Sequence, residues 1–181
     1  MMFPGLTPDQ SQILGAHFTD QMKLARGGYF LKEGKVCNQI GIVTKGMCRH
    51  FYKTKDGDVT RWVTLTGTFV ISLKSFIQQS PAIENIQAIE TTEIAIMPRT
   101  SWLNLYEQHE FLRTYWLRSI EENYIGMEER VFNLIAKTAE ERYYWTLENQ
   151  PRLIQEVPDK YLASMLGIHP RHLSRIRSLR K

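Results

Sequence analysis

The sequence predicts an α+β protein in which an N-terminal jelly-roll-like β-barrel is followed by a long helix and then by a C-terminal helix-turn-helix segment. Three observations lead to this prediction. Up to about residue 98, short β-branched and aromatic stretches alternate with turn residues. From about residue 100, apolar residues recur at helical spacing instead. Finally, residues 157–181 combine small and apolar residues with a cluster of basic ones.

The composition is that of an ordinary globular protein. Of 181 residues, 43% are hydrophobic and 23% are charged. No apolar run approaches the roughly 20 residues that a membrane-spanning helix needs, and the first residues lack the basic and apolar regions of a secretory signal. We therefore expect a cytoplasmic protein with no membrane partner, in which Cys37 and Cys48 stay reduced.

The net charge of +4 is unevenly distributed. Residues 157–181 hold six basic residues and one acidic residue, a balance of +5, so the other residues together carry −1. A basic segment on a nearly neutral body points to a polyanionic partner such as nucleic acid, whereas the alternative is a solvated basic end. The charged residues of this segment are Asp159, Lys160, Arg171, Arg175, Arg177, Arg180 and Lys181.

The first part of the chain is predicted to form a short helix and then the barrel. Thr7 is a suitable N-cap and Pro8 a suitable first residue for a helix that ends near Phe18. Strands are expected at Tyr29–Lys32, Ile40–Thr44, Met47–Lys53, Val59–Leu65, Ile86–Ile89 and Glu93–Met97. Residues 69–79 interrupt them as a short helix or loop. Short strands at this spacing favour a sandwich or a small barrel.

Two of these strands have the pattern of a β-hairpin. Arg49–Tyr52 precedes a four-residue turn, Lys55–Asp58, and Val59–Val63 follows it. We therefore expect these two strands to pair in antiparallel fashion.

A long amphipathic helix is predicted over residues 109–137. Its apolar residues recur at alternating spacings of three and four, which is the pattern of a coiled-coil seam. At about 1.5 Å per residue the helix would be about 40 Å long, enough to cross the whole domain or to pair with a second copy. The narrow seam and its flanking charges favour pairing over packing within the chain. The seam residues are Leu117, Ile120, Tyr124, Met127, Val131 and Leu134.

A new helix is predicted to begin after Thr138. Thr138 and Glu141 have the spacing of a capping box, in which each side chain accepts a hydrogen bond from the other residue's amide. We expect this break to be a domain boundary as well. The predicted units are a barrel over residues 1–108, a dimerisation helix over 109–137 and a helix-turn-helix domain over 138–181.

Residues 157–179 match a helix-turn-helix position by position. The two helices of this motif cross steeply, so one contact position must be small, and Ala163 meets this need. The turn needs a residue that accepts a positive φ angle, which Gly167 supplies. The inner faces are formed by Leu162, Leu166, Ile168, Leu173 and Ile176.

The second helix of this motif is left with a basic outer face. Arg171 and Arg175 are four residues apart and project from the same side, and an arginine can donate two hydrogen bonds to guanine in the major groove of DNA. The alternative is an ordinary helical hairpin whose small residues match by chance. The candidate DNA-binding residues are His169, Arg171, His172, Ser174, Arg175, Arg177, Ser178, Arg180 and Lys181.

With these elements in order, the sequence resembles the Crp/Fnr family of bacterial transcription regulators over residues 6–181. The resemblance rests on Ile42–Arg49 in the barrel, on the seam helix, and on Leu162–Ile168 and Leu173–Arg177. It implies a cyclic-nucleotide-binding-like barrel and a homodimer whose recognition helices read a two-fold symmetric site in double-stranded DNA, with RNA polymerase as a further partner. It also implies base-reading roles for Arg171 and Arg175.

The sequence departs from the family pattern where members of the family bind cyclic AMP. Those members carry a Gly-Glu pair and, several residues later, an arginine that holds the cyclic phosphate. Here Thr68 follows Gly67, and the stretch Ser80–Ala82 has no basic residue. A buried phosphate without a partner is costly, so we expect no tight binding of cyclic AMP. The candidate ligand pocket is nevertheless placed at Gly67, Thr68, Phe69, Ser80 and Ala82.

Two further departures concern the ends of the sequence. The N-terminal cysteine cluster of oxygen-sensing members is missing, which argues against an iron–sulfur centre. The hairpin wing that follows the second helix in many relatives is expected to be absent or very short.

Two other functions are compatible with parts of this sequence. A small-molecule-binding or interaction module, with a helix-turn-helix that no longer binds DNA, would show no steep salt dependence of binding. A metal-dependent cupin enzyme would need several metal ligands, but His50 has no second histidine near it in the predicted barrel. We therefore predict no catalytic residue, no metal and no cofactor, and the effector of the barrel stays unidentified.

Overall fold

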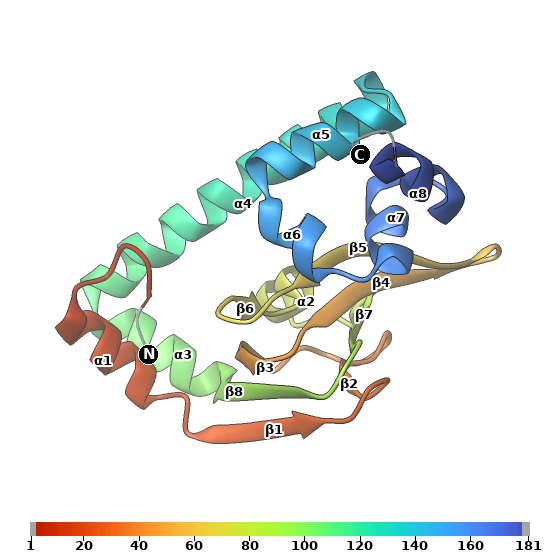
Figure 1. The fold of residues 1–181 in the computed structure, drawn as a ribbon. Coiled ribbons are helices and arrows are strands. Elements are labelled where there is room, and N and C mark those ends of the chain that lie inside the picture. The colour runs from red at the N-terminus through yellow and green to blue at the C-terminus, as the bar shows by residue number, and fades with distance from the viewer. Residues whose placement is uncertain (1–2, 179–181) are drawn as a thin grey trace.

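The computed structural model describes residues 3–178, and its N-terminal part is a sandwich of two antiparallel four-stranded sheets (Figure 1). One sheet has the order β1-β8-β3-β6, formed by β1 (Asp20–Leu24), β8 (Thr92–Pro98), β3 (Gln39–Lys45) and β6 (Phe69–Val70). The other has the order β2-β7-β4-β5, formed by β2 (Tyr29–Leu31), β7 (Asn85–Ala88), β4 (Cys48–Thr54) and β5 (Gly57–Thr64). The jelly-roll-like barrel expected from the strand pattern is thereby confirmed.

The six predicted strands are all present, with ends shifted by no more than two residues. β1 and β6 were not predicted. β1 is a largely polar edge strand, Asp-Gln-Met-Lys-Leu, that pairs only with β8 in the described structure. β6 is two residues long and opens the interval 69–79, whose remainder contains the short helix α2 (Leu73–Gln78).

The predicted hairpin is formed by β4 and β5, in a register that runs from Cys48 opposite Thr64 to Thr54 opposite Gly57. Because Thr54 pairs with Gly57, the turn contains only Lys55 and Asp56, so the prediction of a four-residue turn was wrong. Gly57 has a φ of +115°, a backbone conformation that residues with a Cβ rarely adopt. The hairpin extends beyond the rest of its sheet (Figure 1).

The barrel core is filled from both sheets and covered at one end by helices. Fully buried side chains include Ile40, Ile86, Ile94, Met97 and Trp102. α1 (Pro8–Ala16) begins as predicted, because Thr7 and Gln10 form a capping box. α3 (Arg99–Gln108) was not predicted, and it contributes Trp102 to the core.

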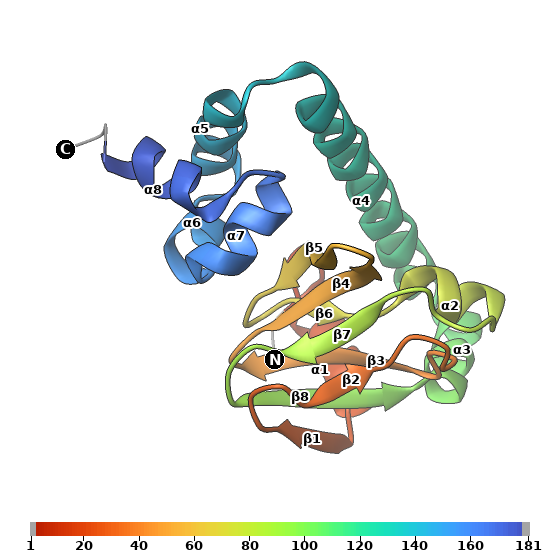
Figure 2. The ribbon, with the colours of Figure 1, turned by 90° about the vertical axis from the view of Figure 1, so that its right-hand side faces the viewer.

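α4 (Glu110–Ala136) is the long helix that the sequence predicts, shorter by one residue at each end. It begins beside α3 at the barrel and extends away from the sheets (Figure 2). Leu112 and Asn133 are its buried residues, so most of its 27 residues lie at the surface of a single chain.

Four helices follow and fold back toward β4 and β5 (Figures 1 and 2). They are α5 (Ala139–Asn149), α6 (Pro151–Glu156), α7 (Asp159–Leu166) and α8 (Pro170–Ser178). The capping box of Thr138 and Glu141 is formed, so the predicted start of α5 is confirmed. A second core joins these helices to the barrel, because Val63, Leu65 and Ile89 pack in the same cluster as the buried residues of α5–α8.

Candidate nucleic-acid interface

α7 and α8 form the two helices of the predicted helix-turn-helix. Gly167 ends α7 with a φ of +65°, as the turn requires. A Cβ at Gly167 would lie 3.3 Å from Leu134 Cδ2 on α4, so the position is also tightly packed. Ala163 is fully buried between the helices. The inner faces bury Leu162, Leu166, Leu173 and Ile176, and Ile168 is half-buried.

The start of α8 is capped by a residue that the sequence assigned to DNA contact. His169 Nδ1 lies 3.2 Å from the backbone nitrogen of Arg171 and accepts its hydrogen bond. Pro170 then occupies the first helical position, where its lack of an N–H costs nothing. His169 therefore stabilises the end of the helix that carries the outer face.

The outer face of α8 is exposed and basic. Arg171, Ser174, Arg175 and Ser178 are all exposed, and no described acidic side chain pairs with either arginine. His172 Nε2 lies 3.2 Å from Arg175 Nη2, and as the acceptor of this hydrogen bond it orients the guanidinium. Two arginine forks on one helix face can each bind a phosphate or the edge of a guanine.

Arg177 lies differently from the other candidate residues. Its guanidinium pairs with Asp159 Oδ1 on α7 and donates a 2.8 Å hydrogen bond to the carbonyl oxygen of Ile154 on α6. These contacts tie α8 to the helices before it. Arg180 and Lys181, which were also predicted to contact DNA, lie outside the described residues.

Two arginines that sequence reasoning missed hold the C-terminal end of α7. Arg130 on α4 donates a 2.8 Å hydrogen bond from Nη2 to the carbonyl oxygen of Met165. Arg142 on α5 donates from Nε to the carbonyl oxygen of Leu166 at 2.8 Å. Cations at this position satisfy the free carbonyls of a helix end and oppose its negative dipole. No sequence spacing signals these contacts, because each joins helices far apart in the chain.

The predicted seam residues on α4 share one exposed face. Leu117 is 58% exposed, Tyr124 62%, Met127 57% and Val131 53%. Leu134 is 41% exposed, because part of its side chain packs on Gly167, and Ile120 is half-buried. Such large apolar side chains in a row are unusual on the surface of a monomer.

The predicted ligand pocket does not come together in the structure. Gly67, Thr68 and Phe69 line a cleft of about 1470 Å³ between the barrel, the N-terminal segment, α4 and α6. Ser80 and Ala82 do not line this cleft. Ala82 is buried in the barrel core, and the carbonyl oxygen of Ser80 accepts a 2.6 Å hydrogen bond from Ser75 Oγ. The five residues therefore belong to two separate places.

The interior of the barrel contains a buried polar cluster that the sequence did not predict. Glu84 accepts hydrogen bonds from Arg61 Nη2 at 2.9 Å and from Ser72 Oγ at 2.8 Å. His50 places Nδ1 3.5 Å from Glu84 Oε2 and Nε2 2.9 Å from Thr64 Oγ1. His50 Nδ1 is the buried side-chain atom without a hydrogen-bond partner in residues 3–178.

Protonation in this cluster follows from burial and from the partners. Burial lowers the pKa of His50, more than the neighbouring Glu84 raises it. Burial raises the pKa of Glu84, but hydrogen bonding and charge from His50, the charge of Arg61 and the Ser72 hydroxyl outweigh it and lower the pKa to about 2. Arg61, whose Nη2 lies 2.9 Å from Glu84 Oε2, is the permanent cation beside this carboxylate.

Other chemistry suggested by the sequence finds little support in the described part of the chain. Cys37 and Cys48 are free and buried, and burial raises the pKa of both thiols, that of Cys48 to about 12. Within residues 3–178, no group of three or more His, Cys, Asp or Glu side chains is placed to hold a metal ion. None of the described helices is long and apolar enough to span a membrane.

Comparisons with known proteins agree with this architecture. The cyclic nucleotide-binding domain family matches residues 21–109. FixK2 from Bradyrhizobium japonicum has a similar fold, with a TM-score of 0.76 and 17% identity over 88% of this chain and 83% of that chain. A CooA mutant from Carboxydothermus hydrogenoformans gives a TM-score of 0.72 and 15% identity over 95% of this chain and 79% of that chain.

A third solved structure is described as a transcriptional regulator of the Crp/Fnr family from Eubacterium rectale. It gives a TM-score of 0.66 and 14% identity over 96% of this chain and 84% of that chain. A search of curated protein sequences finds no match. Residues 21–109 thus match the cyclic nucleotide-binding domain family, and the chain has a fold similar to that of the Crp/Fnr transcription regulators.

Proposed function

We propose that this protein is a transcription regulator of the Crp/Fnr type that binds double-stranded DNA as a homodimer through α8. The observation that carries the proposal is the exposed basic face of α8 within a fully packed helix-turn-helix. In this proposal residues 1–108 act as a sensor, residues 109–137 pair two chains, and residues 138–181 bind DNA. RNA polymerase is a further partner in this proposal.

Arg171 and Arg175 are the proposed base-reading residues. They lie on the outer face of α8, on the side away from the buried Leu173 and Ile176. His172 orients Arg175, and Ser174 and Ser178 offer hydroxyl groups to phosphates beside it. Arg177 has a different role in this proposal, because Asp159 and the carbonyl oxygen of Ile154 already occupy its guanidinium.

Dimerisation through α4 gives the two recognition helices a two-fold relation. The exposed seam from Leu117 to Leu134 supports this step, because pairing would remove large apolar side chains from water. Two α8 helices related in this way would read a two-fold symmetric site in neighbouring major grooves.

Selection of bound fragments from a random DNA pool tests this function. The wild type is expected to enrich a two-fold symmetric motif, and Arg175→Ala is expected to lose or relax one base position in each half of it, at a cost of about tenfold or more in affinity. Arg26→Ala is a matched control, because Arg26 is an exposed arginine on the barrel. No enrichment by the wild type, with or without added cell extract as an effector source, would contradict the proposal.

We also propose that the barrel does not bind cyclic AMP tightly. Ala82 offers no cation to the cyclic phosphate, and the buried carboxylate of Glu84 would repel it from the barrel interior. Isothermal titration of the full chain with cyclic AMP is expected to give a Kd weaker than about 1 mM. A Kd in the micromolar range would overturn this part of the proposal.

A further inference from the structure

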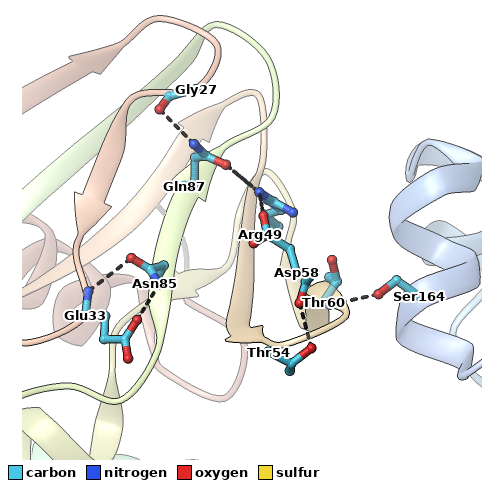
Figure 3. Close-up of polar contacts among 10 residues, drawn as sticks. Gly27, Glu33, Arg49, Thr54, Asp58, Thr60, Asn85, Gln87 and Ser164 are labelled. Carbon is cyan, nitrogen blue, oxygen red and sulfur yellow. Dashed lines mark hydrogen bonds and ion pairs between the residues drawn. The ribbon is translucent and has the colours of Figure 1, made fainter.

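α7 is held in place by hydrogen bonds with different parts of the same chain. On one side it lies against β5, where the backbone N–H of Thr60 donates a 2.9 Å hydrogen bond to Ser164 Oγ (Figure 3). On the other side, Arg130 of α4 and Arg142 of α5 bind the carbonyls at its C-terminal end. The first helix of the helix-turn-helix therefore contacts both the barrel and the long helix α4.

On the barrel side of α7, a buried arginine of β4 forms a series of polar contacts. Arg49 Nη2 forms a 2.6 Å ion pair with Asp58 Oδ2 on β5 and a 2.8 Å hydrogen bond with Gln87 Oε1 on β7. Gln87 Nε2 donates in turn to the carbonyl oxygen of Gly27 at 2.9 Å. Figure 3 shows this chain of contacts crossing the outer face of the sheet toward α7.

Arg49 also reaches α7 itself. Its guanidinium carbon lies 3.8 Å from the ring centre of Phe51 and 5.1 Å from that of Tyr161, which is a residue of α7. The planar cation thus contacts an aromatic ring of the barrel and lies near one of the helix-turn-helix. The position of α7 depends on how the β4–β5 hairpin presents Arg49 and Thr60.

We propose that the β4–β5 hairpin positions the recognition helix directly, within one subunit, with Ser164 and Arg49 as the positioning residues. α7 and α8 are packed together through Leu162 and Leu173, so a shift of α7 carries α8 with it. A change in the hairpin would therefore reach α8 without passing through α4. The inference rests on the proposed function only for its consequence, which is the control of DNA binding.

Hydrogen–deuterium exchange of the full chain, without DNA, tests the coupling. Ser164→Ala removes the acceptor for the Thr60 amide and keeps a residue that favours helix. Exchange of the Thr60 amide and of amides in both α7 and α8 is expected to become roughly two- to tenfold faster. Ser101→Ala is the control, because Ser101 is a half-buried serine of α3 for which the structure gives no side-chain hydrogen bond.

A second variant separates coupling from general loss of stability. Asp58→Asn removes the ion pair with Arg49 while keeping the shape of the side chain, and it is expected to speed exchange in α7 and α8 with little change in α1 and α3. Faster exchange at Thr60 alone, or equally faster exchange throughout the chain, would overturn the inference. Because no DNA is present, failure of the proposed DNA binding would be seen separately in the selection experiment.

Discussion

The double variant Met127→Glu/Val131→Glu is expected to convert a dimer of this protein into a monomer. Both residues lie on the predicted seam, and their side chains are 57% and 53% exposed in a single chain. Pairing of two variant helices would bring four carboxylates into an apolar contact, where like charges without partners are strongly unfavourable. We expect self-association to weaken at least about 100-fold, as measured by sedimentation equilibrium.

The fold of the monomer should survive this change, because neither side chain contributes to the described core. The matched control is Ile77→Glu/Ile83→Glu, which adds the same charges at two exposed isoleucines outside α4. This control is expected to remain dimeric. A wild type that is monomeric at all accessible concentrations, or a seam variant that still dimerises, would contradict pairing through α4.

Loss of the dimer should also weaken DNA binding. A dimer on a two-fold symmetric site gains from the second contact because that contact forms at high effective concentration. The seam variant is therefore expected to bind the selected site about 100-fold more weakly than the wild type, while a single half-site is bound equally by both. A gel-shift titration at fixed salt would measure this, since phosphate contacts make affinity depend on ionic strength.

Local sequence signals predicted the elements that carry most of the proposed function. The positive φ angle of Gly167 and the capping box at Thr138 are each properties of a short stretch of chain. Such signals survive folding because the backbone conformation that they require does not depend on distant neighbours. The helix-turn-helix was therefore located to within a few residues.

Signals that depend on tertiary packing were missed or incomplete. The polar strand β1 forms because β8 offers an edge for pairing, which its own residues do not indicate. On α4, the seam prediction included Leu134, which packs in part on Gly167 of its own chain. It left out Ile125, Phe132 and Ile135, which are 55%, 59% and 80% exposed, so the apolar face of α4 is wider than the predicted seam.

The candidate pocket residues illustrate a related dependence on tertiary packing. Gly67 and Ala82 were placed together by resemblance, but Gly67 lines the cleft outside the barrel core and Ala82 is buried within that core. The polar residues that do meet are His50, Arg61 and Glu84, which come from β4, β5 and the segment before β7. Their meeting depends on strand register, which the spacing of residues along the sequence does not determine.

Glu84→Ala is expected to lower the free energy of unfolding by about 3 kcal/mol, because removal of one partner leaves buried polar groups unpaired. Ser72 and His50 would lose their neighbour in the barrel interior, and Arg61 would lose its ion pair. This loss is at the lower end of the range for breaking a buried ion pair. The reason is that the Arg61 side chain is 33% exposed, so its guanidinium can be solvated after Glu84 is removed. Urea unfolding at pH 7 measures it, with Glu90→Ala, an exposed glutamate, as the control.

The pH dependence of stability distinguishes a lost charge from a lost side chain. The pKa of Glu84 falls from its usual 4.5 to about 2 on folding, so its ionised form stabilises the fold above pH 4.5 and this contribution is lost as the pH falls toward 2. The difference between wild type and Glu84→Ala should therefore shrink as the pH drops below 4.5. His50, whose pKa burial lowers, should cause an earlier loss below 6.5, because the unfolded chain binds that proton first. This loss should be larger in Glu84→Ala, which lacks the carboxylate that raises the pKa of His50. A difference between the two proteins that stays constant down to the acid transition would show that Glu84 acts by packing and not by charge.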